Sequence, residues 1–276
     1  MSTPRASSLR VPITINPFEL KPLHFDWVDT LKMALVGVSI FPVRLVTLIT
    51  SVLGISTISF VATIGHDESK PLPSWRRTLI QPIKPLARAI LWSLGFWKIS
   101  IKRHEGSAPH GCMGVLAAAP HYSLIDPFVL AWLELPCSVS KKAVRSIPLV
   151  GRVAAALQCI FVDRKDPASK RKTAHAIIDR GQSAASGQAD AWPPVLVFPE
   201  GTCTNGAALI SFKAGAFLAG VPVQPVALSY THGEHGLSLS AATDDAEMRL
   251  LYAMLQFSNS LEVTYLPLHH PTDAEL

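Results

Sequence analysis

The stretch that decides the fold is residues 114–127, which read GVLAAAPHYSLIDP. Its apolar first part, Gly114 to Ala119, predicts a strand, and the apolar residues from Phe128 to Leu135 predict a helix just after it. A histidine, His121, and an aspartate, Asp126, lie between the two elements. Because α/β proteins usually carry functional residues in loops between strand ends and helix starts, this stretch is the first candidate for chemistry.

Two interpretations of His121 and Asp126 are open at this point. Their spacing of five does not place both side chains on one helical face, which needs three or four, so the pair meets only if the loop folds back. Alternatively, Asp126 caps the helix, because Asp suits the cap position and Pro127 the first helical position. His121 would then be an ordinary loop histidine.

A second polar loop, residues 198–205, reads FPEGTCTN and follows another buried apolar strand. It holds the carboxylate of Glu200, a glycine, Gly201, that allows close approach of the backbone, and the hydroxyls of Thr202 and Thr204. Such a loop can bind a phosphate or polarise a hydroxyl, whereas a purely structural role would leave Glu200 bracing the loop. The presence of this second motif favours the functional interpretation of the first.

Composition points to a membrane. The 276 residues are 49% apolar and only 16% charged, and the net charge of +5 suits anionic partners such as a membrane surface or a phosphate-bearing substrate. We expect no nucleic acid partner, because the sequence has no zinc-finger spacing, RNA-binding aromatic signature or arginine-rich tract. The four cysteines are widely spaced without a metal-ligand pattern, so we expect reduced thiols and no metal site.

The chain divides into four predicted segments. These are a flexible N-terminal segment at 1–30, a membrane-embedded helix or re-entrant hairpin at 31–65, a linker with interfacial amphipathic helices at 66–98, and an α/β domain at 99–276. In the second segment, Leu45 to Ile64 contains no Asp, Glu, Lys or Arg, and a helix of this length spans about 30 Å, the thickness of the hydrocarbon core. One spanning helix and a kinked hairpin both fit, and a buried core helix is the structural alternative.

The third segment mixes basic residues and tryptophans with an apolar stripe between Trp75 and Trp97. This pattern is typical of an interfacial helix or helix pair, and a core-packed amphipathic helix fits nearly as well. Pro82 and Pro85 predict a break within it.

From residue 99 onward, apolar runs of strand and helix length alternate. The predicted strands are 99–103, 112–118, 138–143, 159–163, 194–198, 221–229 and 261–266. The predicted helices are 127–134, 148–157, 168–183, 212–219 and 245–257. The alternation predicts an α/β fold in which a mostly parallel sheet is flanked by helices and preceded by the N-terminal membrane helix or hairpin.

The two polar loops together carry a family resemblance. His121 to Asp126 matches the His-x4-Asp motif of the glycerolipid acyltransferases, and FPEG at residues 198–201 matches their phosphate-side motif. Further matching stretches are residues 16–18, 41–44, 75–77, 118–121, 147–152, 200–205, 212–217 and 221–226. Over roughly residues 16–270 the chain resembles most closely the lysophosphatidylcholine acyltransferase branch. It departs from that branch at Gly206, where an arginine is usual, and over residues 231–250.

The resemblance implies transfer of an acyl group from a coenzyme A thioester to a hydroxyl of a lysophospholipid, with acyl-CoA as co-substrate and no cofactor. It implies His121 as the general base, because a free hydroxyl is a poor nucleophile and an imidazole with a pKa of about 6.5 can take its proton. Asp126 would fix the imidazole tautomer and stabilise the imidazolium. Strand-end backbone amides are the expected donors to the tetrahedral oxyanion.

The same resemblance implies which residues contact the acceptor lipid. Glu200, Gly201 and Thr202 form the expected phosphate-side loop, although a carboxylate cannot bind phosphate directly and Glu200 would instead contact the acceptor hydroxyl or hold a cation. Arg164, at the end of a predicted strand, and Lys213 are further candidates for the phosphate. A solvated surface charge is the structural alternative for Arg164.

Other functions fit the same residues. Lysophosphatidate, or acetyl-CoA with a lyso-ether lipid, are alternative substrates, and a non-catalytic membrane-anchored lipid-binding protein and a thiol enzyme using Cys203 are alternatives of a different class. The expected location is the endoplasmic reticulum membrane with the α/β domain on the cytosolic face, the Golgi and lipid droplets being the alternatives. The sequence contains no Asp-x-Asp-x-Asp-Gly loop, so we expect no EF-hand calcium site in it.

Overall fold

The computed structural model describes residues 16–19, 25–108, 114–231, 239–242 and 245–272. The predicted flexible segment 1–30 lies largely outside these residues, as do Cys112 and residues 232–238 of the stretch that departs from the family.

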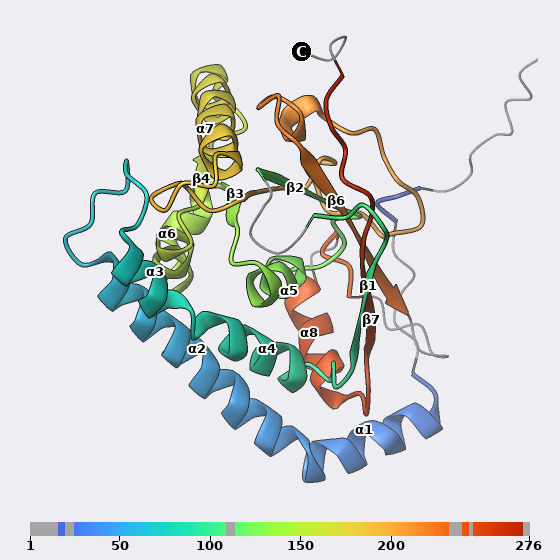
Figure 1. The fold of residues 1–276 in the computed structure, drawn as a ribbon. Coiled ribbons are helices and arrows are strands. Elements are labelled where there is room, and N and C mark those ends of the chain that lie inside the picture. Colours follow the sequence, from blue (N-terminus) through green and yellow to red (C-terminus); the bar gives the residue numbers. More distant parts are fainter. Residues whose placement is uncertain (1–15, 20–24, 109–113, 232–238, 243–244, 273–276) are drawn as a thin grey trace, which may run out of the picture.

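A seven-stranded sheet forms the centre of the described chain, in the order β1-β7-β6-β2-β5-β3-β4 (Figure 1). Its strands are β1 (Ile99–Arg103), β2 (Val115–Ala119), β3 (Cys137–Lys141), β4 (Ile160–Val162), β5 (Val195–Val197), β6 (Val223–Thr231) and β7 (Ser260–Tyr265). Neighbouring strands are parallel except for the β6–β7 pair. Each observed strand overlaps a predicted one, which confirms the mostly parallel α/β sheet.

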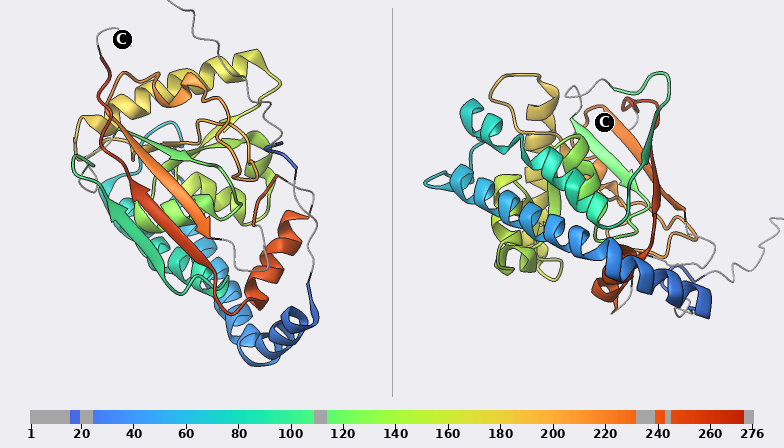
Figure 2. Two further views of the ribbon diagram at one scale, coloured as in Figure 1. Left: turned by 90° about the vertical axis from the view of Figure 1, so that its right-hand side faces the viewer. Right: turned by 90° about the horizontal axis from the view of Figure 1, so that it is seen from below.

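Helices cover both faces of the sheet (Figure 2). They are α3 (Ser74–Ile80), α4 (Ile83–Ser93), α5 (Asp126–Leu133), α6 (Val150–Ala156), α7 (Pro167–Ala185) and α8 (Ala246–Leu255), with 3-10 turns η1 (Lys142–Ser146) and η2 (Ala214–Ala216). In β2, Leu116 and Ala118 join the core formed with α4, α5 and α8, whereas Val115 and Ala117 join the core beneath α7 and η2. Because successive side chains of a strand point to opposite faces, β2 needs apolar residues throughout.

The predicted helix at 212–219 is wrong, since only the short turn η2 forms there. Gly215 lies in its middle and disfavours helix by about 1 kcal/mol relative to alanine. A segment this short also cannot offset the cost of helix nucleation without tertiary support. Instead, the Lys213 N–H donates to the Pro199 carbonyl over 2.8 Å, which ties the segment to the second polar loop.

The predicted break near Pro82 is confirmed, because α3 ends at Ile80 and α4 begins at Ile83. The apolar stripe of α4, which includes Ala87 and Leu91, is fully buried against α2 and α5. These contacts favour the core-packed alternative for α4.

Two helices precede the domain, α1 (Trp27–Ser39) and α2 (Phe41–Thr63), and they meet at Ile40. The second is long and apolar enough to cross a membrane, with a mean hydropathy of 2.1, and 28% of its apolar window is buried. It lies along the base of the domain beneath α4 rather than projecting from it (Figure 1).

The buried face of α2 is rich in small residues, and several large apolar residues lie on its exposed face. Small residues such as Ser51, Ser59 and Ala62 are buried against the domain, while Val46 and Leu53 are exposed. Because small residues let two helix backbones approach closely, the serine and glycine content that weakens α2 as a spanning helix is explained by its packing on α4.

The N-terminal part of α2 is fixed by Arg44, whose side chain is fully buried. Its guanidinium donates to the carbonyls of Met254 and Gln256 over 2.6 and 2.5 Å and to that of Phe257 over 2.9 Å. These carbonyls lie at and just after the end of α8, where backbone acceptors lack partners within the helix and carry partial negative charge.

We therefore expect Arg44→Met to lower the free energy of unfolding by about 3 kcal/mol, because it removes charged donors from buried carbonyls. Denaturant titration in detergent, followed by tryptophan fluorescence, measures the change. The matched control is Lys32→Met on the exposed surface of α1, which should change stability by less than about 0.5 kcal/mol. Equal effects of the two substitutions would contradict an anchoring role for Arg44.

Candidate active site

The two polar loops meet at one edge of the sheet. β2 and β5 are parallel neighbours, in register from Val115 opposite Val195, and each loop leaves the carboxyl end of its strand. Neighbouring parallel strands place such loops side by side. The Thr204 N–H donates to the His121 carbonyl over 2.9 Å and joins the loops directly.

The loop after β2 folds back on the carboxylate of Asp126, which is fully buried. Asp126 Oδ2 lies 2.9 Å from His121 Nδ1 and accepts the backbone N–H groups of Tyr122 and Ser123 over 2.8 and 2.9 Å. The helix-cap interpretation is wrong, because the cap residue of α5 is Ile125 and Asp126 is its first residue. The pair is therefore formed, as its functional interpretation requires.

A tyrosine that sequence reasoning missed completes this arrangement. The buried hydroxyl of Tyr230 donates to Asp126 Oδ1, and its ring stacks on that of Tyr122 with centroids 5.0 Å apart. Burial, followed by the nearby Asp126 carboxylate, raises the pKa of Tyr230 well above its ordinary value, so the phenol remains a donor. The sequence offered only one indication of this role, namely that Tyr230 directly follows the predicted strand 221–229.

The imidazole of His121 is enclosed on several sides. Its ring stacks on Phe198 with centroids 3.9 Å apart, and its Nδ1 is hydrogen-bonded to Asp126. Burial lowers the pKa of His121, but the hydrogen bond and charge of Asp126, together with the nearby Cys203, outweigh burial and raise the pKa to about 9. The imidazolium is thus favoured in the folded protein.

Glu200 braces the two loops from within. Its side chain is buried, Oε1 accepts the His121 backbone N–H over 2.6 Å, and Oε2 accepts a long, 3.4 Å hydrogen bond from the Thr204 hydroxyl. Burial raises the pKa of this carboxyl group. These contacts fit the structural alternative for Glu200, in which its side chain braces the loop.

A cavity of about 480 Å³ opens beside His121 and brings together several predicted residues. His121, Gly201, Arg164 and Lys213 all line it, together with Lys170 of α7, which the sequence did not single out. Three cationic side chains in one hollow focus positive potential there. The cavity therefore suits a phosphate group held close to the imidazole.

The two glycines of the second loop differ in what they allow. Gly201 has a φ of +68°, and a Cβ there would lie 2.6 Å from Lys213 Nζ, so glycine lets the ammonium reach the loop. Gly206, which replaces the usual arginine, has a φ of +72°, and a Cβ there would lie 3.0 Å from the Tyr122 ring. Thr202 is exposed and is not among the residues that line the cavity.

A His–Asp pair beside a basic cavity, at the carboxyl ends of parallel strands, is an arrangement suited to proton transfer next to a bound anion. Residues 98–229 match the family model described as Acyltransferase. This part of the chain therefore resembles the acyltransferase family.

Relatives that align with nearly the whole chain show which branch of the acyltransferases it resembles. The chain is 35% identical to "Lysophosphatidylcholine acyltransferase 2" of Danio rerio, over 99% of this chain and 50% of that protein. It is 33% identical to "Lysophospholipid acyltransferase LPCAT4" of Homo sapiens, over 96% of this chain and 50% of that protein. The resemblance to the lysophosphatidylcholine acyltransferase branch is confirmed, and the chain spans about half the length of these relatives.

A solved structure supports the fold. The crystal structure of the 1-acyl-sn-glycerophosphate acyltransferase PlsC from Thermotoga maritima superposes with a TM-score of 0.54 at 17% identity, covering 90% of this chain and 88% of that one. The likeness extends over most of both chains and concerns the fold alone.

The His121–Asp126 pair predicts a measurable titration. We expect His121 to titrate near pH 9 in the folded protein and Asp126→Asn to lower the pKa of His121 towards its ordinary value of about 6.5, because the main group that opposes burial is removed. NMR of the imidazole protons measures both values, and the exposed His175→Gln should leave the His121 titration unchanged. A wild-type pKa near 6.5 that Asp126→Asn does not lower would contradict this assignment.

The raised pKa of His121 also makes the stability of the fold depend on pH. Because the folded-state pKa of His121 is raised, the pair stabilises the fold fully below about pH 6.5, and this contribution is lost as pH rises through about 9.

Tyr230→Phe should lower the free energy of unfolding by about 1–3 kcal/mol, because it leaves Asp126 Oδ1 buried without this donor. A double-mutant cycle with Asp126→Asn isolates the interaction from the general effect of removing a hydroxyl. The control is Tyr252→Phe on α8, whose ring contacts Phe25. Additive effects of Tyr230→Phe and Asp126→Asn would show that the two side chains do not interact.

Proposed function

We propose that the protein is a membrane-bound acyl-CoA:lysophospholipid O-acyltransferase that acts on lysophosphatidylcholine in phospholipid synthesis and remodelling. The observation that carries the proposal is the His121–Asp126 pair, 2.9 Å apart, whose histidine lines a basic cavity in the region that matches the acyltransferase family model. Lysophosphatidylcholine is chosen as the acceptor because the relatives' names specify it.

In the proposed reaction, the deprotonated form of His121, which becomes the major form above about pH 9, accepts the proton of the acceptor hydroxyl at Nε2 while the hydroxyl oxygen attacks the thioester carbonyl carbon. Asp126, on Nδ1, stabilises the imidazolium that forms. Collapse of the tetrahedral intermediate breaks the carbon–sulfur bond and expels the coenzyme A thiolate, which takes the proton from His121. An imidazolium of pKa about 9 is well matched to a thiol whose pKa is about 8.5.

The acceptor phosphate would lie in the cavity among Arg164, Lys170 and Lys213, close to the hydroxyl that reacts. Glu200 would act by holding the His121 backbone, and Gly201 by admitting the Lys213 ammonium, with Thr202 at the exposed end of the loop. Lysophosphatidate and a lyso-ether lipid present the same phosphate and hydroxyl and remain the alternative acceptors.

A second candidate is a thiol hydrolase, which the proximity of Cys203 to the His121 imidazole favours. Cysteine, histidine and aspartate close together are the residue types of a nucleophile with its base and orienting group. The cavity lining argues against it, because His121 lines the cavity and Cys203 is not among its lining residues.

Membrane attachment would use the exposed surface of α1 and α2. Trp27, Leu35, Val38, Val46 and Leu53 are all more than half exposed there, and an apolar surface with a tryptophan suits the bilayer interface. Since α2 packs on the domain along its length, partial immersion in one leaflet fits better than a spanning helix. We place the protein at the endoplasmic reticulum membrane, with the domain on the cytosolic face.

The test is acyl transfer in liposomes by wild-type, His121→Ala and Cys203→Ser proteins, with labelled acyl-CoA and a panel of lysophosphatidylcholine, lysophosphatidate and lyso-ether lipid. We expect His121→Ala to lower kcat/KM by about 10²–10⁴-fold while the protein stays folded, and Cys203→Ser to retain turnover. Loss of turnover in both variants would favour the thiol enzyme. Folded wild-type protein that acylates no acceptor would favour a non-catalytic lipid-binding protein.

A further inference from the structure

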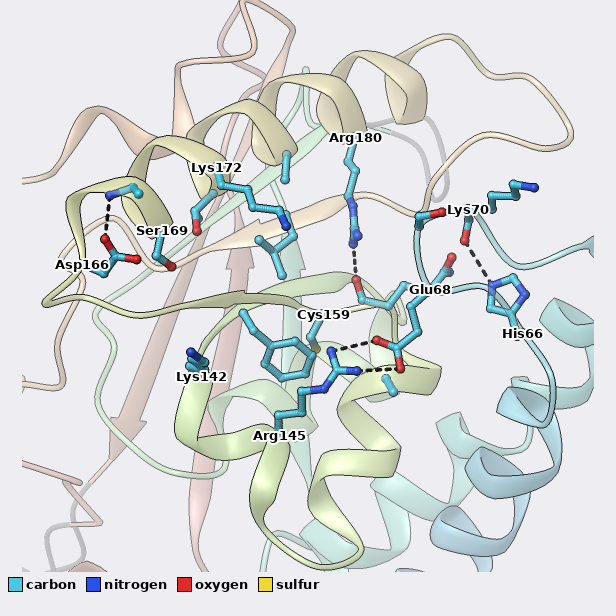
Figure 3. Close-up of a pocket in the computed structure, with 18 residues that line it drawn as sticks. His66, Glu68, Lys70, Lys142, Arg145, Cys159, Asp166, Ser169, Lys172 and Arg180 are labelled. Atoms are coloured by element: carbon cyan, nitrogen blue, oxygen red, sulfur yellow. Dashed lines mark hydrogen bonds and ion pairs between the residues drawn. The ribbon is translucent and has the colours of Figure 1, made fainter.

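A second cavity, of about 750 Å³, lies beyond the edge strand β4 (Figure 3). Its walls come from the chain after α2, from η1, from β4 and from α7. The motifs that identify the active site do not include it.

The charges around this cavity are mostly positive. Five cationic side chains line it, Lys70, Lys142, Arg145, Lys172 and Arg180, against only two carboxylates. Both carboxylates already have partners. Glu68 forms an ion pair with Arg145 over 2.9 Å, and Asp166 accepts the backbone N–H of Ala168 over 2.8 Å. The hollow therefore keeps an excess of positive charge.

Three of the cations are available to an anion. Arg180 is held by the Gln158 carbonyl, by Cys137 Sγ at 3.1 Å and by the Trp192 ring at 3.8 Å, none of which is a carboxylate. Lys172 on α7 and Lys142 on η1 project from opposite walls (Figure 3), and neither forms an ion pair within the described residues. Cations from separate elements that converge on one hollow focus the potential inside it.

The cavity also has an aromatic wall. The Phe161 ring lines it, with the Arg145 guanidinium 5.4 Å from the ring centroid. A flat ring beside cations suits a ligand that has both a planar base and phosphates.

This cavity adjoins the active-site cavity. Thr173 lines both, and Phe161 and Val162, consecutive residues of β4, line one each. A long ligand could therefore place a phosphate-bearing end here and a reactive end beside His121.

We propose that the second cavity binds the phosphate-bearing nucleotide end of the acyl donor, a coenzyme A thioester; this assignment rests on the proposed function. The acceptor lipid carries its phosphate a few bonds from the hydroxyl that reacts, so its phosphate must lie near His121. The donor differs, because the pantetheine arm separates its phosphates from the thioester. A donor of this shape needs a second basic site at a distance from the base.

The test is calorimetric titration of the full chain in detergent with coenzyme A and with adenosine 3′,5′-bisphosphate, which lacks the pantetheine arm. Lys142→Gln/Lys172→Gln should raise the Kd for both ligands at least about tenfold, because it removes two charged phosphate contacts. It should raise the KM for acyl-CoA without changing the KM for the lysophospholipid. Lys142→Arg/Lys172→Arg should restore binding.

The matched control is Arg171→Gln, one position from Lys172 on α7 but lining neither cavity, which should leave both Kd values unchanged. Unchanged coenzyme A binding by the double glutamine variant, in a protein whose wild type turns over, would overturn this assignment and leave the proposed function intact. Displacement of adenosine 3′,5′-bisphosphate by an equal concentration of glycerol 3-phosphate would also overturn this assignment, because it would indicate a lipid head-group site. If the wild-type protein binds coenzyme A, the double glutamine variant does not, and the wild-type protein shows no acyl transfer, the result supports the cavity assignment and refutes the proposed function.

Discussion

The buried carboxylate of Asp126 is the group on which the rest of the site depends. An uncompensated charge at this depth would cost several kcal/mol, and here the imidazole of His121, two backbone N–H groups and the hydroxyl of Tyr230 offset that cost. The loop after β2 must fold back to supply three of these donors, and β6 must lie beside β2 to supply the fourth. Sheet order and loop shape are thus constrained by one charge.

A second buried carboxylate, Glu200, fixes the same histidine from the other side. Asp126 contacts the ring of His121 and Glu200 its backbone N–H, and each carboxylate comes from the loop of a different strand. The parallel pairing of β2 with β5 sets the distance between those loops. His121 is therefore held in position without a bound substrate, which is the preorganisation that general-base chemistry needs.

The sequence predicts what is local and misses what is distant. Buried parallel strands are continuous apolar runs, so each strand was found, and the His121–Asp126 pair was found because one short loop contains both residues. The contacts of Tyr230 with Asp126 and of Arg44 with the end of α8 join residues 104 and about 210 positions apart, and no periodicity encodes such a pairing. The prediction of a helix at 212–219 was wrong because it rested on apolar composition and gave too little weight to Gly215 and to the short length of the segment.

Hydropathy also could not show how α2 is used. The window from residue 45 carries no charge, yet small residues such as Ser51 and Ala62 pack on the domain while large ones such as Val46 and Leu53 are exposed, a distribution that a hydropathy average does not register. The position of α2 also fixes which side of the domain would face a membrane, because α2 and α7 lie on opposite sides of the sheet (Figure 1). If the exposed side of α2 rests in a bilayer, then α7 and the two basic cavities beside it face water. A phosphate-rich, water-soluble donor could then enter the second cavity directly from water.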